Sequence, residues 1–174
     1  MKIKNLVFIA IMTALICVCS WVTLTIGPVP FTLQTFAVFL AFVILGGRDA
    51  SIAIALYILL GIVGVPVFAG FKSGIGTIMG PTGGFIIGYL LIGLIYWAIP
   101  KKLKSSNIAK LIVFIVCNAI CYAAGVAWFV LFKYGTIETA ISACVIPFIV
   151  PDALKISLAV IIGGEVSRKL KLKN

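Results

Sequence analysis

LVFIAIMTALICVCSWVTLTI, residues 6–26, is the stretch that sets the class of protein to expect. It contains no charged residue and has the length of about 20 residues that a helix needs to cross a bilayer. It is also longer than the apolar core of a signal peptide, roughly 7–15 residues. Of the 174 residues, 63% are hydrophobic and 10% are charged, whereas soluble domains have about 25% charged residues. The sequence therefore predicts an integral membrane protein, with one transmembrane domain over residues 1–174.

Five more apolar segments follow the first. We expect membrane helices over residues 6–26, 33–45, 51–65, 85–99, 108–132 and 151–170. The second, third and fourth are shorter than a straight span and are expected to lean on glycine-rich flanks. The predicted fold class is all-α, an integral membrane bundle of six transmembrane helices. A long glycine-rich outer loop is expected between the third and fourth helices.

The basic residues of this bundle sort to one side. Eleven of the fourteen Lys and Arg fall on the side of the two termini, namely Lys2, Lys4, Arg48, Lys101, Lys102, Lys104, Lys110, Arg168, Lys169, Lys171 and Lys173. Cytoplasmic loops of membrane proteins are enriched in Lys and Arg, so we predict that both termini are cytoplasmic. The net charge of +10 thus encodes topology in a lipid membrane and does not indicate a nucleic-acid partner.

Three stretches of unusual composition share the predicted outer side. They are GPVPFT at 27–32, PVFAGFKSGIGTIMGPTGG at 66–84, and residues 147–152. The second stretch is apolar and rich in glycine, with Lys72 as its single charge. Such backbone beside a membrane bundle is expected to fold back over or into a cavity. The alternative is an ordinary solvated loop. A binding site that opens outward is the natural inference.

PFIVPDALK, residues 147–155, places two ionisable residues in apolar sequence, Asp152 and Lys155. Three residues apart, they share one face of the sixth predicted helix. A Lys inside a span costs about 2.5–3.5 kcal/mol on insertion scales, so it should face the bundle interior and a partner. In a functional interpretation, Lys155 meets an anionic ligand group and Asp152 accepts N–H donors. Alternatively, the two charges only neutralise each other, or Lys155 extends outward to the interface.

Other polar and small residues in the predicted helices are candidates of lower specificity. Gln34 begins the second helix, and Asn118 and Tyr122 lie four apart on the fifth. They line the same cavity or hydrogen-bond between helices. Ala10 and Ala14, four apart on the first helix, allow close helix approach, either for internal packing or for docking to another membrane subunit.

Several chemistries are not supported by the residues present. The chain has no histidine, so neither a Ser-His-Asp nor a Cys-His catalytic set is available. The glycine-rich stretch lacks the Gly-Lys-Ser/Thr signature of a phosphate-binding loop. The five cysteines all lie in apolar runs and are expected to pack rather than bind metal. We expect no catalytic residues, no metal and no cofactor.

Four motifs in this order resemble one known family. They are PVPFTLQT at 28–35, GIVGVPVFAG at 61–70, GPTGGF at 80–85 and PF-x-x-x-D-x-x-K at 147–155. They are similar to the biotin-specific substrate-binding (S) component of energy-coupling-factor (ECF) transporters, the BioY family. The resemblance implies a multi-pass protein of the bacterial cell membrane that captures biotin from outside. It also implies two kinds of partner, a transmembrane coupling (T) subunit and two cytoplasmic ATPases that hydrolyse ATP.

The resemblance also implies roles for individual residues. Biotin carries a ureido group, an apolar bicycle and a carboxylate tail. The sequence leaves open which end of biotin meets which charge, and of the two arrangements we expect Asp152 to meet the ureido N–H groups and Lys155 the carboxylate. The remaining expected binding residues are Gln34, Phe31, Phe68, Thr82, Asn118 and Tyr122, with Phe148 beside them. Ala10 and Ala14 match the family's docking motif for the coupling subunit. Phe71, Lys72 and Ser73 depart from the more glycine-rich stretch expected there.

Three alternatives to biotin capture remain open at this point. An S component for another vitamin, such as thiamine or riboflavin, would share the fold. A membrane enzyme acting on lipid is disfavoured by the lack of histidine and of a carboxylate cluster. A channel-forming or structural bundle would show flux without ATPase partners, or no saturable binding.

Overall fold

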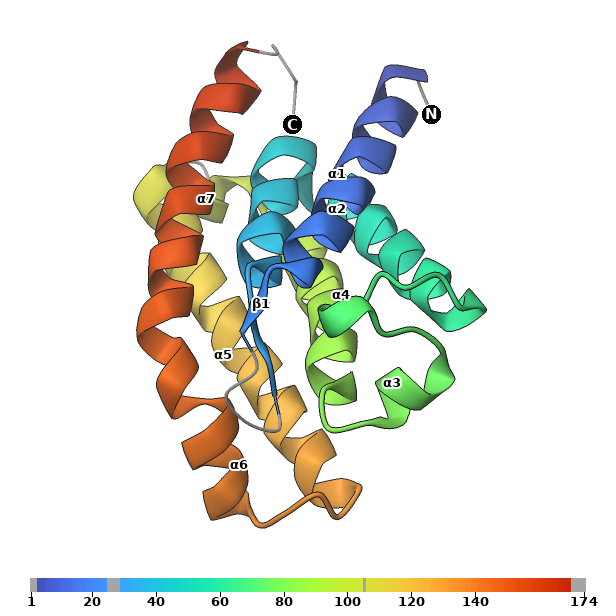
Figure 1. Cartoon of the computed structure of the whole chain (residues 1–174). Coiled ribbons are helices and arrows are strands. Elements are labelled where there is room, and N and C mark those ends of the chain that lie inside the picture. The colour runs from blue at the N-terminus through green and yellow to red at the C-terminus, as the bar shows by residue number, and fades with distance from the viewer. Residues whose placement is uncertain (1–2, 25–28, 105, 170–174) are drawn as a thin grey trace.

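The computed structural model describes residues 3–24, 29–104 and 106–169 of a chain that is almost entirely helical (Figure 1). The helices are α1 (Ile3–Trp21), α2 (Gln34–Val63), α3 (Ile75–Met79), α4 (Gly83–Ala98), α5 (Asn107–Leu131), α6 (Ile137–Cys144) and α7 (Ile149–Lys169). Short 3-10 turns cover Ala69–Phe71, Lys101–Lys104 and Ile146–Phe148. The strands β1 (Thr23–Leu24) and β2 (Phe31–Thr32) pair antiparallel.

The helices have the length and composition of membrane spans. Within the described residues, four helical stretches are long and apolar enough to cross a bilayer, namely Ile3–Trp21, Gln34–Val63, Asn107–Leu131 and Ile137–Lys169. Helix α4 is apolar but shorter. The all-α membrane fold expected from composition is therefore confirmed.

The second and third predicted helices form one bent helix, α2, and a glycine lies at the bend. At Gly46 the backbone has φ 78° and ψ 176°, a region that is essentially restricted to glycine. The first half of α2 rises to this point and the second half descends from it (Figure 1). The six predicted helices are thus present as α1, the two halves of α2, α4, α5 and α7.

Replacement of this glycine tests the bend. Gly46→Ala forces a side chain into the strained region, which costs about 1–3 kcal/mol, and should lower the midpoint of thermal unfolding in detergent. Gly164→Ala is the matched control, because its added Cβ would lie 3.8 Å from the Asn107 side chain, an ordinary contact. Equal midpoints for the two variants would contradict the role given to Gly46.

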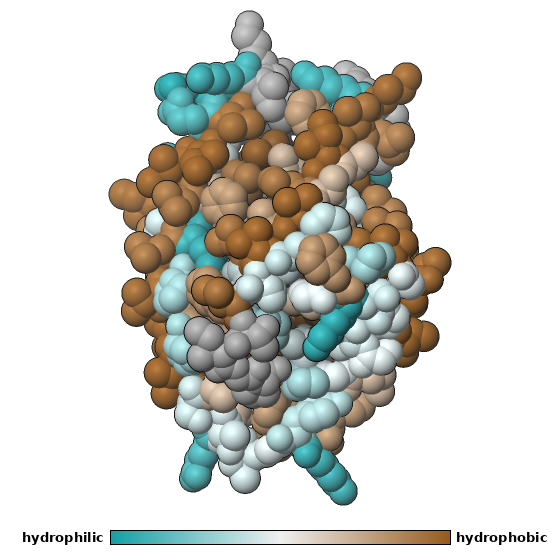
Figure 2. Space-filling view, viewed as in Figure 1, coloured by the Kyte–Doolittle hydropathy of each residue, from teal (hydrophilic) through white to brown (hydrophobic). Residues whose placement is uncertain are grey.

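The two ends of the bundle differ in character. The start of α1, the bend at Gly46 and the end of α7 lie at one end, and the β hairpin, α3 and α6 lie toward the other (Figure 1). Hydrophobic surface covers the flanks between them (Figure 2). The placement of the irregular segments on the outer side of the membrane stays a prediction. Lys2, Lys171, Lys173, and residues 27–28 of the first loop lie outside the described residues.

Three of the differences between the predicted and the observed helices have a clear physical reason. The first helix ends at Trp21 rather than at residue 26, because Thr23 enters the β hairpin; residues 25–26 lie outside the described part. Helix α7 begins at Ile149, two residues early, since a proline in the first turn loses no hydrogen bond. Helix α6 was not predicted; the Thr136 side chain caps it by accepting from the Thr139 amide.

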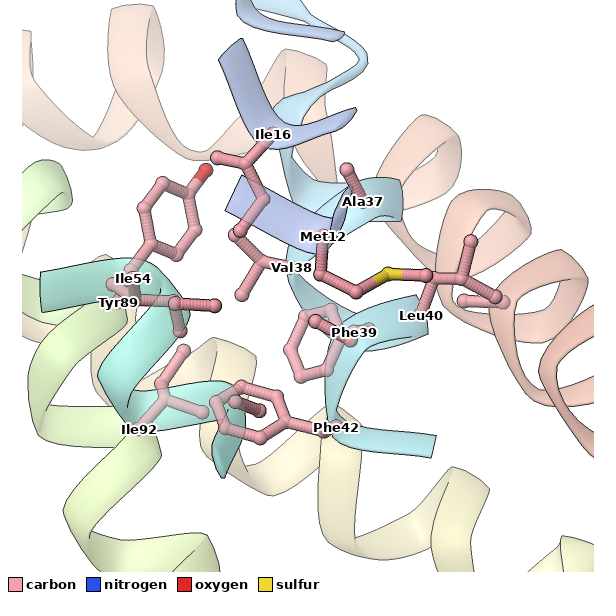
Figure 3. Packing of buried hydrophobic residues seen from close by; sticks show 14 of the residues in the cluster. Met12, Ile16, Ala37, Val38, Phe39, Leu40, Phe42, Ile54, Tyr89 and Ile92 are labelled. Atoms are coloured by element: carbon pink, nitrogen blue, oxygen red, sulfur yellow. The ribbon is translucent and has the colours of Figure 1, made fainter. Parts of the chain in front are cut away.

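The apolar core centres on the first half of α2. Phe39, Phe42 and Phe114 are fully buried, and the Phe39 and Phe114 ring centroids are 4.8 Å apart. Met12 and Ile16 of α1 pack over the same cluster (Figure 3). This packing fixes the start of α2, where the candidate site begins.

Candidate substrate-binding site

A cavity of about 390 Å³ lies among the N-terminal parts of α2, α4 and α7, the middle of α5 and the segment 68–82. Its volume is in the range of small-molecule sites, roughly 300–1,000 Å³. Most of the predicted binding residues line it, namely Gln34, Phe68, Thr82, Asn118, Tyr122, Asp152 and Lys155. The fold thus brings these residues together from four separate parts of the chain, namely α2, the segment 68–82, α5 and α7.

Asp152 is the centre of a buried polar cluster. Its Oδ1 accepts from Lys155 Nζ at 2.8 Å and its Oδ2 accepts from the Tyr122 hydroxyl at 2.7 Å. Asp152 is 3% exposed and Lys155 is 6% exposed. A carboxylate has about four acceptor positions, and these contacts use one on each oxygen. Asp152 therefore keeps acceptor capacity for a ligand.

The Lys155 ammonium is surrounded on several sides. Besides Asp152, it donates to the Thr32 carbonyl oxygen at 2.7 Å, and it lies 3.8 Å from the centroid of the Phe31 ring. Phe31 is not among the residues that line the cavity, and its ring stacks on Phe148. Phe31, predicted to contact the ligand, thus lies outside the cavity lining and in cation–π contact with the lysine.

Two polar groups in the cavity wall lack a hydrogen-bond partner within the described structure. They are Gln34 Nε2 and the Tyr57 hydroxyl, in residues that line the cavity and are 5% and 1% exposed. Tyr57 lies near Gln34 and Ser20, but no group meets hydrogen-bonding geometry with its hydroxyl. An unsatisfied buried polar group costs about 1–3 kcal/mol. The cavity thus offers unused polar groups at the wall formed by α2.

Two tyrosines of this site were not singled out from the sequence. Tyr57 and Tyr89 both line the cavity, and the Tyr89 hydroxyl is 3.2 Å from Thr35 Oγ1. The Tyr89 phenol oxygen points away from Phe42 and Ile92 (Figure 3). The sequence offers one signal for them, because each tyrosine lies in an apolar run. A buried tyrosine hydroxyl needs a polar partner, so such a residue points to a polar site.

The glycine-rich segment is packed onto the bundle. At α1, the Ser20 hydroxyl donates to the Val67 carbonyl oxygen, and Trp21 Nε1 donates to the Pro66 carbonyl oxygen at 2.8 Å. Phe71 stacks on Trp21, with 5.1 Å between ring centroids. This side of the segment is therefore anchored to the end of α1.

The other side of the segment is anchored to α5 and to the turn that follows it. Trp128 Nε1 donates to the Gly80 carbonyl oxygen at 3.1 Å, and the Tyr134 hydroxyl donates to the Met79 carbonyl oxygen. Residues between these anchors line the cavity. The segment is thus hydrogen-bonded to the bundle on both sides of the residues that line the cavity.

Ala10 and Ala14 lie away from the cavity. Both are exposed on α1, in a surface that includes Leu6, Val7 and Val18. They are not used for packing within the chain in the way that the buried Met12 and Ile16 are. This leaves a small-residue surface on α1 that faces outward from the bundle.

Comparisons with known proteins agree with this architecture. The BioY family profile matches residues 1–172. A Thermotoga maritima protein named "Biotin transporter BioY" is 41% identical over 167 residues, covering 92% of this chain and 94% of its own length. A Lactococcus lactis subsp. cremoris protein named "Biotin transporter BioY2" is 37% identical over 174 residues, covering 99% and 95%.

A solved structure shares the fold. It is described as the S-component for biotin from an ECF-type ABC transporter, and it matches with a TM-score of 0.85 and 28% sequence identity. The match covers 99% of this chain and 94% of that one. With its membrane-spanning helices, a family match over residues 1–172 and relatives aligned along nearly their whole length, this chain is a multi-pass membrane protein that belongs to the BioY family.

Proposed function

We propose that this chain captures biotin in the cavity and serves as the S component of an ECF-type transporter. The observation that carries the proposal is the Asp152 cluster, a buried carboxylate with spare acceptor positions inside a cavity of small-molecule size. Membership of the BioY family supports biotin as the ligand. The relative from T. maritima is named as a biotin transporter, and the similar solved structure is described as a biotin S-component.

The cavity suits the head group of biotin. The ureido group offers N–H donors to the spare positions on Asp152, and its carbonyl oxygen can accept from a donor such as Gln34 Nε2, which is otherwise unpartnered. The apolar bicycle would pack against Phe68 and Phe148, which line the cavity. Asn118 and Thr82 line the same space and would adjust the fit. Binding thus needs no covalent step in this chain.

Titration of the purified chain with biotin tests this function. Saturable 1:1 binding is expected, with competition by unlabelled biotin and none by an equal excess of thiamine or riboflavin. Lack of biotin binding, with saturable binding of another vitamin, would assign the chain to a different substrate. Lack of saturable binding of any vitamin would contradict a role as S component.

We assign the ATP-driven step of transport to partner subunits. We infer that the cavity opens to the outside, because the end opposite to it carries most of the basic residues. A transmembrane coupling subunit and two cytoplasmic ATPases would supply ATP hydrolysis, and this chain would have no ATPase site of its own. Ala10 and Ala14 are exposed on α1, where small residues permit close approach of a partner helix. We therefore place the coupling subunit on this surface.

Enlargement of a small residue tests that placement. Ala14→Trp should prevent co-purification of the coupling subunit, because a large side chain separates the helices, while biotin affinity stays within about twofold. Ile161→Trp is the matched control on the exposed, apolar surface of α7 and should assemble normally. Normal assembly of Ala14→Trp would place docking elsewhere.

A further inference from the structure

Three charged side chains among the described residues line the cavity, and their charges do not cancel. They are Asp152, Lys155 and Lys72. The salt bridge between Asp152 and Lys155 pairs one negative with one positive charge. Lys72 forms no salt bridge with any residue that the structure describes. The cavity therefore carries an excess of one positive charge, which belongs to Lys72 and suits a ligand with one negative charge.

Lys155 is a poor partner for a ligand carboxylate. Its ammonium already donates to Asp152 and to the Thr32 carbonyl oxygen, and the Phe31 ring covers it. A ligand carboxylate at this ammonium would lie next to the Asp152 carboxylate, and two anions at close range in a buried site repel each other strongly. The neutral ureido group of biotin has no such cost there. The ligand carboxylate is therefore not expected at Lys155, the position that the sequence predicted for it.

Lys72 is held at the cavity by a tight turn. The Phe68 amide donates to the Lys72 carbonyl oxygen at 3.0 Å, and the residues between them include Gly70 at φ 69° and Phe71 at φ 58°. A bulky residue with positive φ is an uncommon and costly conformation, and stacking on Trp21 accompanies it. Phe68, at the other end of the turn, is 1% exposed. A buried residue and a stacked ring thus fix the backbone from which the Lys72 side chain extends.

The side chain of Lys72 is exposed while it also lines the cavity, which places it at the mouth. Asp152 and Lys155 belong to α7, which packs against α2 and α5, whereas the turn at Lys72 packs against α1. The charges therefore come from different walls. A ligand that places a neutral polar head at Asp152 would extend its anionic tail toward the mouth, where Lys72 lies.

We propose that Lys72 is the counter-ion for the ligand's carboxylate and selects the free acid over neutral derivatives. The proposal rests on biotin capture as proposed above. Lys72, which departs from the glycine-rich stretch expected at this position, would thus determine specificity for the charged ligand. Because the contact is at the mouth and solvent-exposed, its effect on affinity is modest and weakened by salt.

The experiment compares biotin with its uncharged primary amide. Dissociation constants for both are measured at low salt in the wild type, in Lys72→Gln, and in Lys133→Gln as the control. Lys133 is exposed on the turn after α5 and is not among the cavity residues. The wild type and Lys133→Gln should prefer biotin by roughly three- to tenfold. Lys72→Gln should bind both ligands alike, with the amide affinity unchanged.

The outcomes separate this proposal from the proposed function. An undiminished preference for biotin in Lys72→Gln would overturn the role of Lys72 while biotin capture stands. An equal loss of preference in Lys133→Gln would also overturn it, because the effect would then come from general surface charge. Failure of the wild type to bind either ligand would overturn biotin capture itself. A preference that falls between 50 mM and 500 mM salt in the wild type, and is absent throughout in Lys72→Gln, supports the contact.

Discussion

Asp152→Asn is expected to weaken biotin binding by about a hundredfold. The substitution keeps the size of the side chain but turns one acceptor oxygen into a donor, so a ureido N–H loses a charged partner. Hydrogen bonds to charged groups contribute about 1.5–3 kcal/mol, which corresponds to roughly 10- to 150-fold in affinity. Lys155 and Tyr122 also lose the partner that orients them. Equilibrium titration with biotin measures the effect.

Stability must be separated from recognition in this variant. Asp152→Asn removes the negative charge and leaves Lys155 as a buried charge without its partner. Breaking a buried ion pair in this way lowers the free energy of unfolding by about 3–5 kcal/mol. The double variant Asp152→Asn with Lys155→Met removes both charges and should recover thermal stability without recovering binding. Glu138→Gln, which changes an exposed carboxylate on α6, should bind as the wild type does. Wild-type affinity in a folded Asp152→Asn protein would exclude Asp152 as a ligand contact.

Gly61→Ala is expected to speed biotin dissociation by about tenfold or more. A Cβ at Gly61 would lie 2.0 Å from Cζ of Phe68, which is 1% exposed and packs edge-on against Tyr57 at 5.5 Å between ring centroids. The Gly61 carbonyl oxygen also accepts from the Gly74 amide at 2.7 Å. Because the ring has no room to move, the segment that covers the cavity should lift from α2. Dissociation of labelled biotin gives the rate.

A compensating change tests the cause of this effect. Phe68→Leu shortens the side chain that meets the new methyl group, so Gly61→Ala with Phe68→Leu should dissociate biotin more slowly than Gly61→Ala alone. Gly164→Ala is the control for a helical glycine whose Cβ has space. Dissociation at the wild-type rate in Gly61→Ala would show that seating of Phe68 does not retain the ligand.

The membrane fold was predictable because it depends on composition summed over long windows. Every predicted span contains a helix, since about 20 apolar residues can satisfy their backbone hydrogen bonds in lipid only as a helix. The end of α1 at Trp21 was not predictable, because it depends on the pairing of Thr23 with Thr32 in the β hairpin. Helix α6 was missed since its sequence, IETAISAC, is short and mixed.

The charged residues of the site and several of its neutral residues could be singled out from the sequence, whereas Tyr57 and Tyr89 could not. Asp152 and Lys155 interrupt an apolar run, and a charge in a span is costly enough to indicate a role. The second hydrogen-bond acceptor of Lys155, the Thr32 carbonyl oxygen, lies 123 residues away in the chain, and only the fold reveals it. Tyr57 and Tyr89 were missed because a tyrosine in an apolar run does not show which way its hydroxyl points. Phe31 could not be distinguished from aromatic residues that line the cavity for the same reason.

A structure of the purified chain with saturating biotin tests the central claim most directly. The account predicts density for biotin in the cavity, with the ureido ring within hydrogen-bond distance of Asp152 and the carboxylate directed to the mouth at Lys72. The salt bridge between Asp152 and Lys155 should persist in the complex. Density that places the carboxylate at Lys155, or biotin bound outside this cavity, would contradict the account.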